Sequence, residues 1–381
     1  MVKKIALLGA TGSIGSSTFE VMREQRERLC VSLAAAYKDF EKLGRLAREF
    51  RIPVLVFTGI TDTVLQAKIR LENPQSKVYF GSLELLKLLA NEDYDIGLNA
   101  IGGSSGIEAT FAILNAGKPL ALANKESLVM GGHLLKGLGG QAQIIPVDSE
   151  HSALFQAIGV SPHQEIRKLI FTASGGAFRT LSLAEFAKIT PAMALRHPNW
   201  EMGAKVTLDS ATMFNKALEV MEAHWLFDMP YKKIEAIIHP QSVIHSIVEY
   251  IDGSHLAQLS YPDMKIPILY ALSYPERYPS ELVKTDLYQY PELNFAAIEP
   301  ERYPLYYLGL EAAKAGGILP TVINAAVEAA IQLFLSEKIS FPELSQRVKK
   351  TLDKAEQISK PNLDEILWAN KYYYDTCLKG L

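Results

Sequence analysis

Residues 4–15 read KIALLGATGSIG, and this stretch decides the fold of the first part of the chain. A short predicted strand at 4–8, apolar from Ile5 to Leu8, is followed by glycines at positions 9, 12 and 15 and then by a predicted helix from Ser16 to Gln25. Glycine allows a tight turn and a close approach of backbone to ligand, while the N–H groups at a helix start attract a pyrophosphate. This order of strand, turn and helix predicts a dinucleotide-binding α/β domain, with Gly-x-x-Gly-x-x-Gly in place of the usual G-x-G-x-x-G.

The composition excludes several classes of protein. The 381 residues suffice for two or three domains, and the 48% hydrophobic and 21% charged content is that of an ordinary globular protein. A formal net charge of −3 argues against a nucleic-acid or membrane-surface partner, and no apolar run approaches the roughly 20 residues of a membrane helix. The only cysteines, Cys30 and Cys377, lie too far apart in sequence for a zinc ribbon or a disulfide framework. We therefore expect a cytoplasmic protein.

The ends of the next predicted strands carry polar residues. A strand at 30–36 ends at Tyr37-Lys38-Asp39, where an acid would bind a ribose 2′-OH, a cation would bind a 2′-phosphate, and an exposed turn would bind neither. Further strands are predicted at 54–57, 96–101 and 120–123. The last of them ends in 124–127, NKES, where Lys125 is either a ligand contact or a surface lysine.

Residues 146–156, PVDSEHSALFQ, place two carboxylates directly after an apolar run. On an extended segment Asp148 and Glu150 would point to the same face, with the Ser149 hydroxyl turned away. Two like charges so close repel unless a proton or a cation lies between them, and oxygen ligands suit Mg²⁺ or Mn²⁺. The stretch predicts either a metal site or a solvated strand end.

Three further segments carry candidate ligands. Ser174 and two glycines follow a strand at 168–170, which indicates an anion nest or an ordinary loop. A loop at 197–203 contains Trp200 and reads as a lid or as a loop docked on the core. Residues 209–224 predict a helix that is capped by Asp209 or Ser210 and carries further polar residues on one face. These are Asn215, Lys216 and Glu219.

The remaining segments predict structure more than chemistry. Residues 237–250 read as strand, turn and strand, and the apolar alternation around His239 and His245 indicates structural histidines rather than metal ligands. Residues 274–305 are rich in Pro and Tyr and predict an extended connector, and from Tyr306 onward the pattern is helical.

Taken together, these motifs closely resemble the 1-deoxy-D-xylulose 5-phosphate reductoisomerase family. The resemblance implies an α/β protein with a Rossmann-like NADPH-binding domain at 1–150, a catalytic α+β domain at 151–285, a linker at 286–310, a helical domain at 311–381, and a homodimer. The matching segments are GATGSIG at 9–15, ALANKESLV at 121–129, PVDSEHSALFQ at 146–156, TASGG at 172–176, HPNW at 197–200, DSATMFNKALE at 209–219, IIHPQSVIHSIVEY at 237–250 and PDMKIP at 262–267.

The resemblance also implies a reaction and a set of site residues. A ketose phosphate would rearrange by retro-aldol and aldol steps with a divalent metal (Mn²⁺, Mg²⁺ or Co²⁺), and NADPH would reduce the product to 2-C-methyl-D-erythritol 4-phosphate. Lys125, Glu150, His197 and Trp200 would be catalytic. The implied metal ligands are Asp148, Glu150 and Glu219; the substrate residues are Lys125, Ser149, Glu150, Ser174, His197, Ser210, Asn215, Lys216 and Glu219; the cofactor residues are Thr11, Gly12, Ser13, Ile14, Tyr37, Lys38, Asp39, Asn124, Glu126 and Gly203.

The chain departs from the family pattern at three places. Tyr37-Lys38-Asp39 replaces Gly-Lys-Asn, and Ala177 replaces a common proline. Glu201 replaces the lid serine, and we expect this added negative charge to weaken substrate binding slightly. Two other functions fit parts of the sequence. One is a metal-free NADPH-dependent reductase of the semialdehyde type, whose thiol-dependent version would need a cysteine nucleophile between Cys30 and Cys377, where the sequence has none. The other is an NADPH-binding sensor, which would not need three acids.

Overall fold

The computed structural model describes residues 2–138, 143–196, 200 and 203–380. These residues form two compact units, and each is described by itself. Unit 1 comprises Met1–Ser127, Leu135–Ser152 and Met264–Val283, and unit 2 comprises Leu128–Leu134, Ala153–Asp263 and Lys284–Leu381. Neither the linker nor the helical tail forms a compact unit of its own among the described residues, so the predicted boundaries at 150, 285 and 310 stay a prediction.

Unit 1 is built on a seven-stranded parallel sheet, as the α/β prediction requires. Its strand order is β4-β3-β2-β1-β5-β6-β7, so the direction of winding reverses between β1 and β5, which are neighbours. In such sheets ligands bind outside the carboxyl ends of the strands at the reversal point. The strands are β1 (Lys3–Leu8), β2 (Leu29–Ala36), β3 (Val54–Phe57), β4 (Lys77–Phe80), β5 (Ile96–Asn99), β6 (Leu120–Leu122) and β7 (Ile144–Pro146).

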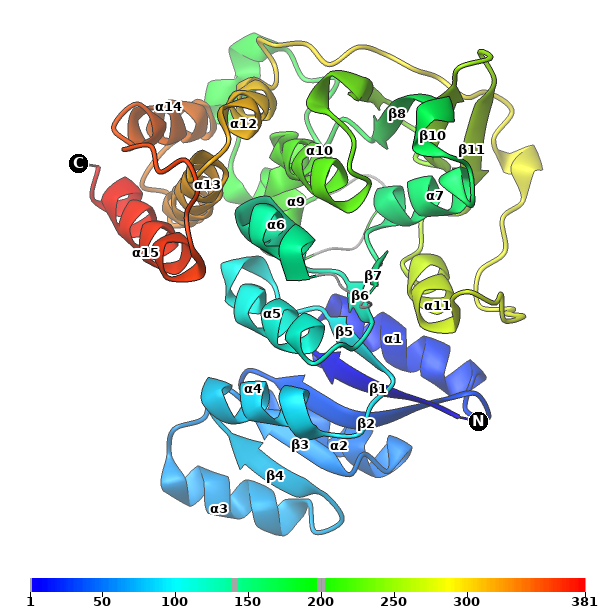
Figure 1. Cartoon of the computed structure of the whole chain (residues 1–381). Coiled ribbons are helices and arrows are strands. Elements are labelled where there is room, and N and C mark those ends of the chain that lie inside the picture. Colours follow the sequence, from blue (N-terminus) through cyan, green and yellow to red (C-terminus); the bar gives the residue numbers. More distant parts are fainter. Residues whose placement is uncertain (1, 139–142, 197–199, 201–202, 381) are drawn as a thin grey trace. The chain divides into compact units, whose positions relative to one another are not determined.

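Helices lie on both faces of this sheet (Figure 1). The strands are nearly continuous apolar runs, β1 being buried from Ile5 to Leu8, because both faces are covered. The helices are α1 (Ser13–Glu24), α2 (Phe40–Phe50), α3 (Thr63–Glu72), α4 (Ser82–Asn91), α5 (Ile107–Asn115), the two ends of α6 (Glu126–Leu138), the start of α7 (Ser149–Ile158), and α11 (Lys265–Ser273), which packs on α1.

Unit 2 contains a mixed four-stranded sheet and most of the remaining helices. The strand order is β11-β10-β8-β9, in which β8 and β9 are parallel and the other pairs antiparallel. The strands are β8 (Ile166–Ala173), β9 (Ile234–Ile238), β10 (Ile244–Tyr250) and β11 (His255–Leu259). The helices are α8 (Pro191–Ala194), α9 (Ala204–Ala211), α10 (Phe214–Leu226), α12 (Pro304–Ala315), α13 (Leu319–Leu335), α14 (Phe341–Leu352) and α15 (Leu363–Lys379).

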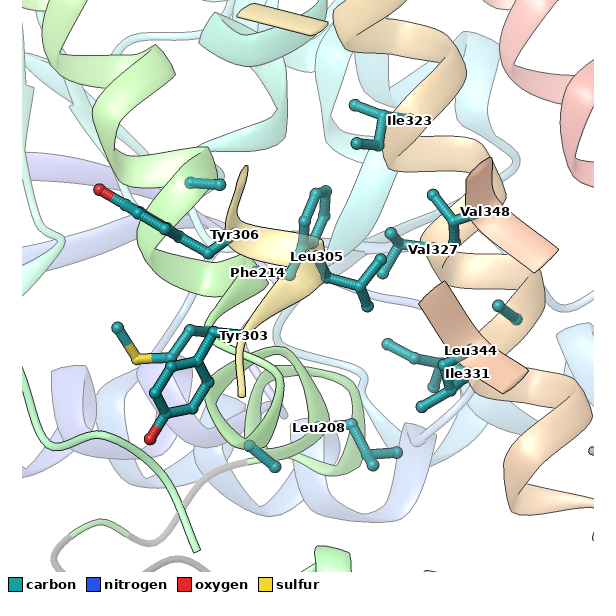
Figure 2. Packing of buried hydrophobic residues seen from close by; sticks show 14 of the residues in the cluster. Leu208, Phe214, Tyr303, Leu305, Tyr306, Ile323, Val327, Ile331, Leu344 and Val348 are labelled. Carbon is teal, nitrogen blue, oxygen red and sulfur yellow. The ribbon is translucent and has the colours of Figure 1, made fainter. Parts of the chain in front are cut away.

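The largest core of unit 2 joins its site-bearing helices to its helical tail. Figure 2 shows side chains from α9, α10, α12, α13 and α14 in one cluster, which includes Phe214 on α10 and Leu305 on α12. The tail is helical, as predicted, and it is interrupted where Gly316 ends α12 with φ 65° and Pro320 stands in the first turn of α13. The start of α10 is therefore held by a large apolar contact.

The proline- and tyrosine-rich connector, predicted to be extended, is largely irregular in its later part. Between residues 284 and 303 the only regular helix in the described part is a 3₁₀ turn at Leu287–Gln289, and Ala296 forms an isolated bridge with Ile238. Within the described ranges, no helix is both long and apolar enough to cross a membrane.

Candidate active site

The glycine turn after β1 closes as the sequence predicts, but the helix begins earlier. Gly9 has φ 77°, and a Cβ at this position would lie 2.3 Å from the Ala100 carbonyl oxygen, so no larger residue fits. Gly12 is the N-cap of α1, which starts at Ser13 rather than at the predicted Ser16. The first residues of α1 therefore overlap with the glycine motif, because Gly12 is the N-cap and Gly15 is already helical. Of the predicted cofactor residues, Thr11 and Gly12 lie in the turn, and Ser13 and Ile14 open the helix.

The end of β2 presents one acid and one base with different surroundings. The Asp39 carboxylate caps α2 by accepting a hydrogen bond from the Lys42 backbone N–H at 3.0 Å. The Lys38 ammonium lies 5.1 Å from the centre of the exposed Tyr37 ring. Asp39 therefore stabilises the start of α2, whereas Lys38 lies over the exposed Tyr37 ring.

The ends of β5 and β6 are joined by buried amide side chains. The Asn124 side-chain nitrogen donates to the carbonyl oxygens of Ile101 and Gly103, both at 2.7 Å, and contacts Glu126 at 3.2 Å. Asn124 and Glu126 are therefore rigidly placed at the carboxyl edge of the sheet, beside the reversal point between β1 and β5.

The acid stretch is not extended, which corrects the predicted geometry. Asp148 stands just before α7, where its side chain accepts from the Glu150 N–H at 3.3 Å and its carbonyl accepts from the Ser152 N–H at 2.8 Å. Asp is a strong N-cap residue, so a helix begins at Ser149, and the Ser149 hydroxyl donates to the Glu150 carboxylate. The oxygens of Asp148 and Glu150 nevertheless lie within 4.8 Å of one another.

Asp148 is held as an anion by two basic neighbours. Burial alone disfavours the charge, but the Lys125 ammonium pairs with this carboxylate and the His151 ring nitrogen lies 3.2 Å from it. Together these two neighbours hold the pKa of the Asp148 carboxyl well below its ordinary value. Lys125 is therefore a charged group at the end of β6 and not a surface lysine. Its side chain is only 11% exposed.

In unit 2 the Ser174 turn and Ser210 are brought together. Gly176, with φ 69°, donates its N–H to the Ser174 hydroxyl at 3.1 Å, and a Cβ on Gly176 would lie 2.6 Å from the Ser210 carbonyl oxygen. The hydroxyl of Tyr303, the residue just before α12, donates to the Gly175 carbonyl at 2.8 Å and helps to fix the turn. The Ser174 turn therefore packs closely against the backbone of Ser210.

The predicted long helix is interrupted, which moves the polar residues to a helix start. Asp209 and Ser210 lie in the last turn of α9 and not at an N-cap, and Met213, with φ 59°, separates α9 from α10. Asn215 and Lys216 stand in the first turn of α10, and both donate to the Glu219 carboxylate. These residues do share one face, as predicted, and Lys216 and Glu219 are buried.

The predicted lid lies mostly outside the described residues. His197, Glu201 and the residues beside them are not described, so their predicted roles stay predictions. Trp200 is half-buried, and its ring lies 6.1 Å from the His245 ring in an edge-on arrangement. Gly203, predicted to bind the cofactor, is the exposed N-cap of α9.

Three polar residues of these regions escaped prediction. His151 is buried and faces Asp148, and Glu222 is a fully buried acid one turn beyond Glu219. His151 follows Asp148 by three residues, and Glu222 follows Glu219 by three. On a helix this spacing places two side chains on the same face, so the sequence could have predicted both contacts. Lys42 donates through its ammonium to the Thr11 carbonyl at 2.9 Å and the Ser16 hydroxyl at 2.8 Å, and the sequence carried no signal for it.

Comparison with known proteins agrees with this geometry. The family described as 1-deoxy-D-xylulose 5-phosphate reductoisomerase matches residues 5–132, its C-terminal domain matches 144–227, and a DXP reductoisomerase C-terminal domain matches 259–374. A reductoisomerase of this name from Chlorobium chlorochromatii is 42% identical over 377 residues, 98% of both chains. One from Lysinibacillus sphaericus is 44% identical over 370 residues, 96% of both chains.

Solved structures agree over the full length. A DOX-P reductoisomerase crystallised with NADPH, fosmidomycin and magnesium has a TM-score of 0.95 and 37% identity, covering 100% of this chain and 98% of that chain. The Zymomonas mobilis reductoisomerase, in complex with NADPH, has a TM-score of 0.92 and 37% identity, covering 100% and 99%.

The parallel sheet, its glycine turn and its polar strand ends define an oxidoreductase of the dinucleotide-binding class. Within that class, the chain belongs to the 1-deoxy-D-xylulose 5-phosphate reductoisomerase family, as its motifs indicated.

Proposed function

We propose that this chain converts 1-deoxy-D-xylulose 5-phosphate to 2-C-methyl-D-erythritol 4-phosphate, the committed step of non-mevalonate isoprenoid precursor synthesis. It is an NADPH-dependent oxidoreductase that also requires a divalent metal, and it isomerises its substrate before reducing it. The observation that carries this proposal is the full-length match to a reductoisomerase solved with NADPH, fosmidomycin and magnesium.

The residues present fit both groups. A cradle in which any Cβ at Gly9 would collide with Ala100 suits a pyrophosphate that needs close backbone approach. Asp148, an anion just after β7, and Glu150, in the first turn of α7, offer the hard oxygen ligands that Mg²⁺ or Mn²⁺ prefers. Glu219 would be the third ligand. When bound, the nucleotide would supply a hydride and the ion would polarise adjacent carbonyl and hydroxyl oxygens.

The chain's own residues would bind and orient the sugar phosphate. Ser174 and Ser210 would donate hydroxyl hydrogen bonds to the phosphate, and Asn215 and Lys216 would add an amide and a cation. Lys125 holds its proton beside Asp148, where it is placed to donate to a substrate oxygen. Trp200, with His197 and the rest of the predicted lid, would exclude water from the reacting carbons.

The same proposal covers partners and location. We expect a homodimer in the cytoplasm that acts on a small sugar phosphate and on neither nucleic acid nor membrane. The described cysteines support a reducing compartment, because Cys30 and Cys377 are both free thiols.

One assay tests this function against its rivals. The full chain is mixed with NADPH and 1-deoxy-D-xylulose 5-phosphate, and cofactor oxidation is followed with Mg²⁺ or Mn²⁺ and with a chelator. We expect oxidation that needs metal and yields the branched polyol phosphate. Oxidation that persists in chelator would favour a metal-free reductase, and tight NADPH binding without any oxidation would favour a sensor.

Glu219 gives a sharper prediction within this function. Glu219→Gln should weaken Mn²⁺ binding by more than about tenfold and lower turnover with it, because a neutral amide is a poorer ligand for a hard cation. NADPH affinity should not change. Mn²⁺ binding is read by electron paramagnetic resonance and NADPH binding by calorimetry.

Two further variants control this experiment. Glu301→Gln makes the same chemical change at an exposed position of unit 2 and should alter nothing. Glu219→Asp keeps the carboxylate beside the buried Lys216, so it should recover part of the Mn²⁺ affinity that the amide loses. A Glu219→Gln variant that loses NADPH binding while keeping Mn²⁺ would contradict a metal-ligand role for this acid.

A further inference from the structure

The end of β2 places its acid and its cation in different surroundings. Lys38 and Asp39 cancel in a simple count, which left the choice between a 2′-phosphate and a 2′-hydroxyl open. In the structure the Asp39 carboxylate accepts the Lys42 N–H and stabilises the start of α2. An acid used as a helix cap is a weaker partner for a ribose hydroxyl, because its oxygen already accepts a backbone hydrogen bond.

A second cation is fixed at the glycine turn. The Lys42 ammonium, on a half-buried side chain, donates to the Thr11 carbonyl oxygen at 2.9 Å and to the Ser16 hydroxyl at 2.8 Å. Ser16 in turn donates to the Gly12 carbonyl at 2.8 Å. An ammonium carries three N–H donors, and these described contacts use two of them. The charge of Lys42 is therefore held against the loop that would receive the adenosine end of a dinucleotide.

We propose that Lys42 is a specificity-determining residue that binds the 2′-phosphate of NADPH and selects it over NADH. The carboxyl end of β2 is where the adenosine ribose lies in a sheet of this kind, and Lys42 reaches the same edge from the first turn of α2. A 2′-phosphate is close to doubly charged, so Lys42 and Lys38 together would match it. The inference rests on the proposed function only in its use of a nicotinamide cofactor.

The competing explanation is mechanical. In that explanation Lys42 is a tether that joins α2 to the glycine turn, and any cofactor binds more weakly once it is lost. NADH separates the two roles, because it differs from NADPH only by lacking the 2′-phosphate. If the Lys42 charge binds the 2′-phosphate, its loss weakens the binding of NADPH alone. If Lys42 is a tether, its loss weakens the binding of both cofactors.

The test measures binding of NADPH and of NADH to the full chain by calorimetry, without substrate or metal. Lys42→Met should raise the Kd for NADPH about tenfold or more, because one charge-assisted hydrogen bond is lost, and should leave the Kd for NADH unchanged. Lys42→Arg keeps the charge and should restore most of the preference. Lys87→Met is the matched control, since Lys87 is an exposed lysine on α4 of the same unit and pairs with Glu84.

The outcomes decide the proposal independently of the reaction. An equal rise of both Kd values in Lys42→Met would make Lys42 a tether, and unchanged values would give it no role at the cofactor. Either result overturns the proposal. Loss of turnover plays no part, because neither ketose phosphate nor metal is present in these titrations.

Discussion

His239 shows how two hydrogen bonds fix the chemistry of a single residue. The ring is fully buried, with Nδ1 lying 3.0 Å from the Asn294 carbonyl and Nε2 accepting the Ile244 N–H at 3.3 Å. Its ring also stacks on Phe295 with centres 5.1 Å apart. Only a neutral ring with its proton on Nδ1 satisfies both bonds. This supports a structural role for His239, as the sequence indicated.

A pH dependence of stability follows from that environment. Burial lowers the pKa of His239 below its ordinary value of 6.5, against the opposing effect of the Asn294 carbonyl. A group whose folded pKa is depressed favours the folded state above the ordinary pKa, and this contribution is lost as pH falls below about 6.5. His239→Asn keeps a donor at the Nδ1 position but cannot titrate. Its free energy of unfolding, measured in urea at pH 8 and pH 5, should fall less with acid than that of the wild type. Parallel pH profiles for the two proteins would contradict this assignment.

At the scale of the element, a buried chain of hydroxyls and amides holds the turn between β5 and α5. The Asn99 amide donates to the Gly106 carbonyl and to the Thr110 hydroxyl, both at 2.9 Å, and its oxygen accepts the Ile101 N–H at 3.2 Å. Thr110 donates to Ser127 at 2.9 Å, and Ser127 donates to Asn124, which clamps the same turn. Each link strengthens the next in such a chain.

Thr110 is the middle of that chain, so its hydroxyl should matter more than that of a helix threonine elsewhere. Thr110→Val keeps the shape but leaves Asn99 and Ser127 each without one buried partner. We expect the free energy of unfolding to fall by about 1–3 kcal/mol in urea titration. The matched control is Thr351→Val, where the buried hydroxyl donates to the Arg347 carbonyl of its own helix at 3.1 Å, and a smaller loss is expected. Equal losses of unfolding free energy in the two variants would show that the linked hydrogen bonds add no stability beyond that of a single buried hydroxyl.

Elements were predictable where one local signal dominated. The strand at 54–57 and the glycine turn after β1 follow from apolar runs and glycines alone. Asp148 was misread because an acid after a strand fits both an extended end and a helix cap, and only the following helix decides. Met213 could not have been foreseen as a break, since methionine rarely adopts a positive φ. The core that packs α9 and α10 overrides its local preference.

The whole molecule has an edge that suits a second copy of the chain. β11 is a terminal strand of its sheet, and four of its five residues are exposed, so both of its faces meet solvent. Leu256 and Leu259 on this strand are 51% and 38% exposed, and Tyr261 just beyond it is 46% exposed. Natural proteins usually protect such an edge with charge or proline, and the segment HLAQL has no Asp, Glu, Lys, Arg or Pro.

The predicted homodimer should therefore use this edge, where two copies of β11 pair around a two-fold axis. Replacing Leu256 and Leu259 together by Glu puts like charges opposite one another in such a pair, which is destabilising. We expect light scattering to show the mass falling from that of two chains to that of one, 42.2 kDa. Val64 and Leu71 on α3 are even more exposed, at 78% and 81%, and their double replacement by Glu should leave the mass unchanged. If the β11 variant stays dimeric, the dimer interface does not use this edge. If the wild-type chain is already monomeric, the predicted homodimer is wrong. Because the charges alter an exposed edge and not a core, thermal unfolding of the separated chains should still be cooperative, which distinguishes dissociation from misfolding.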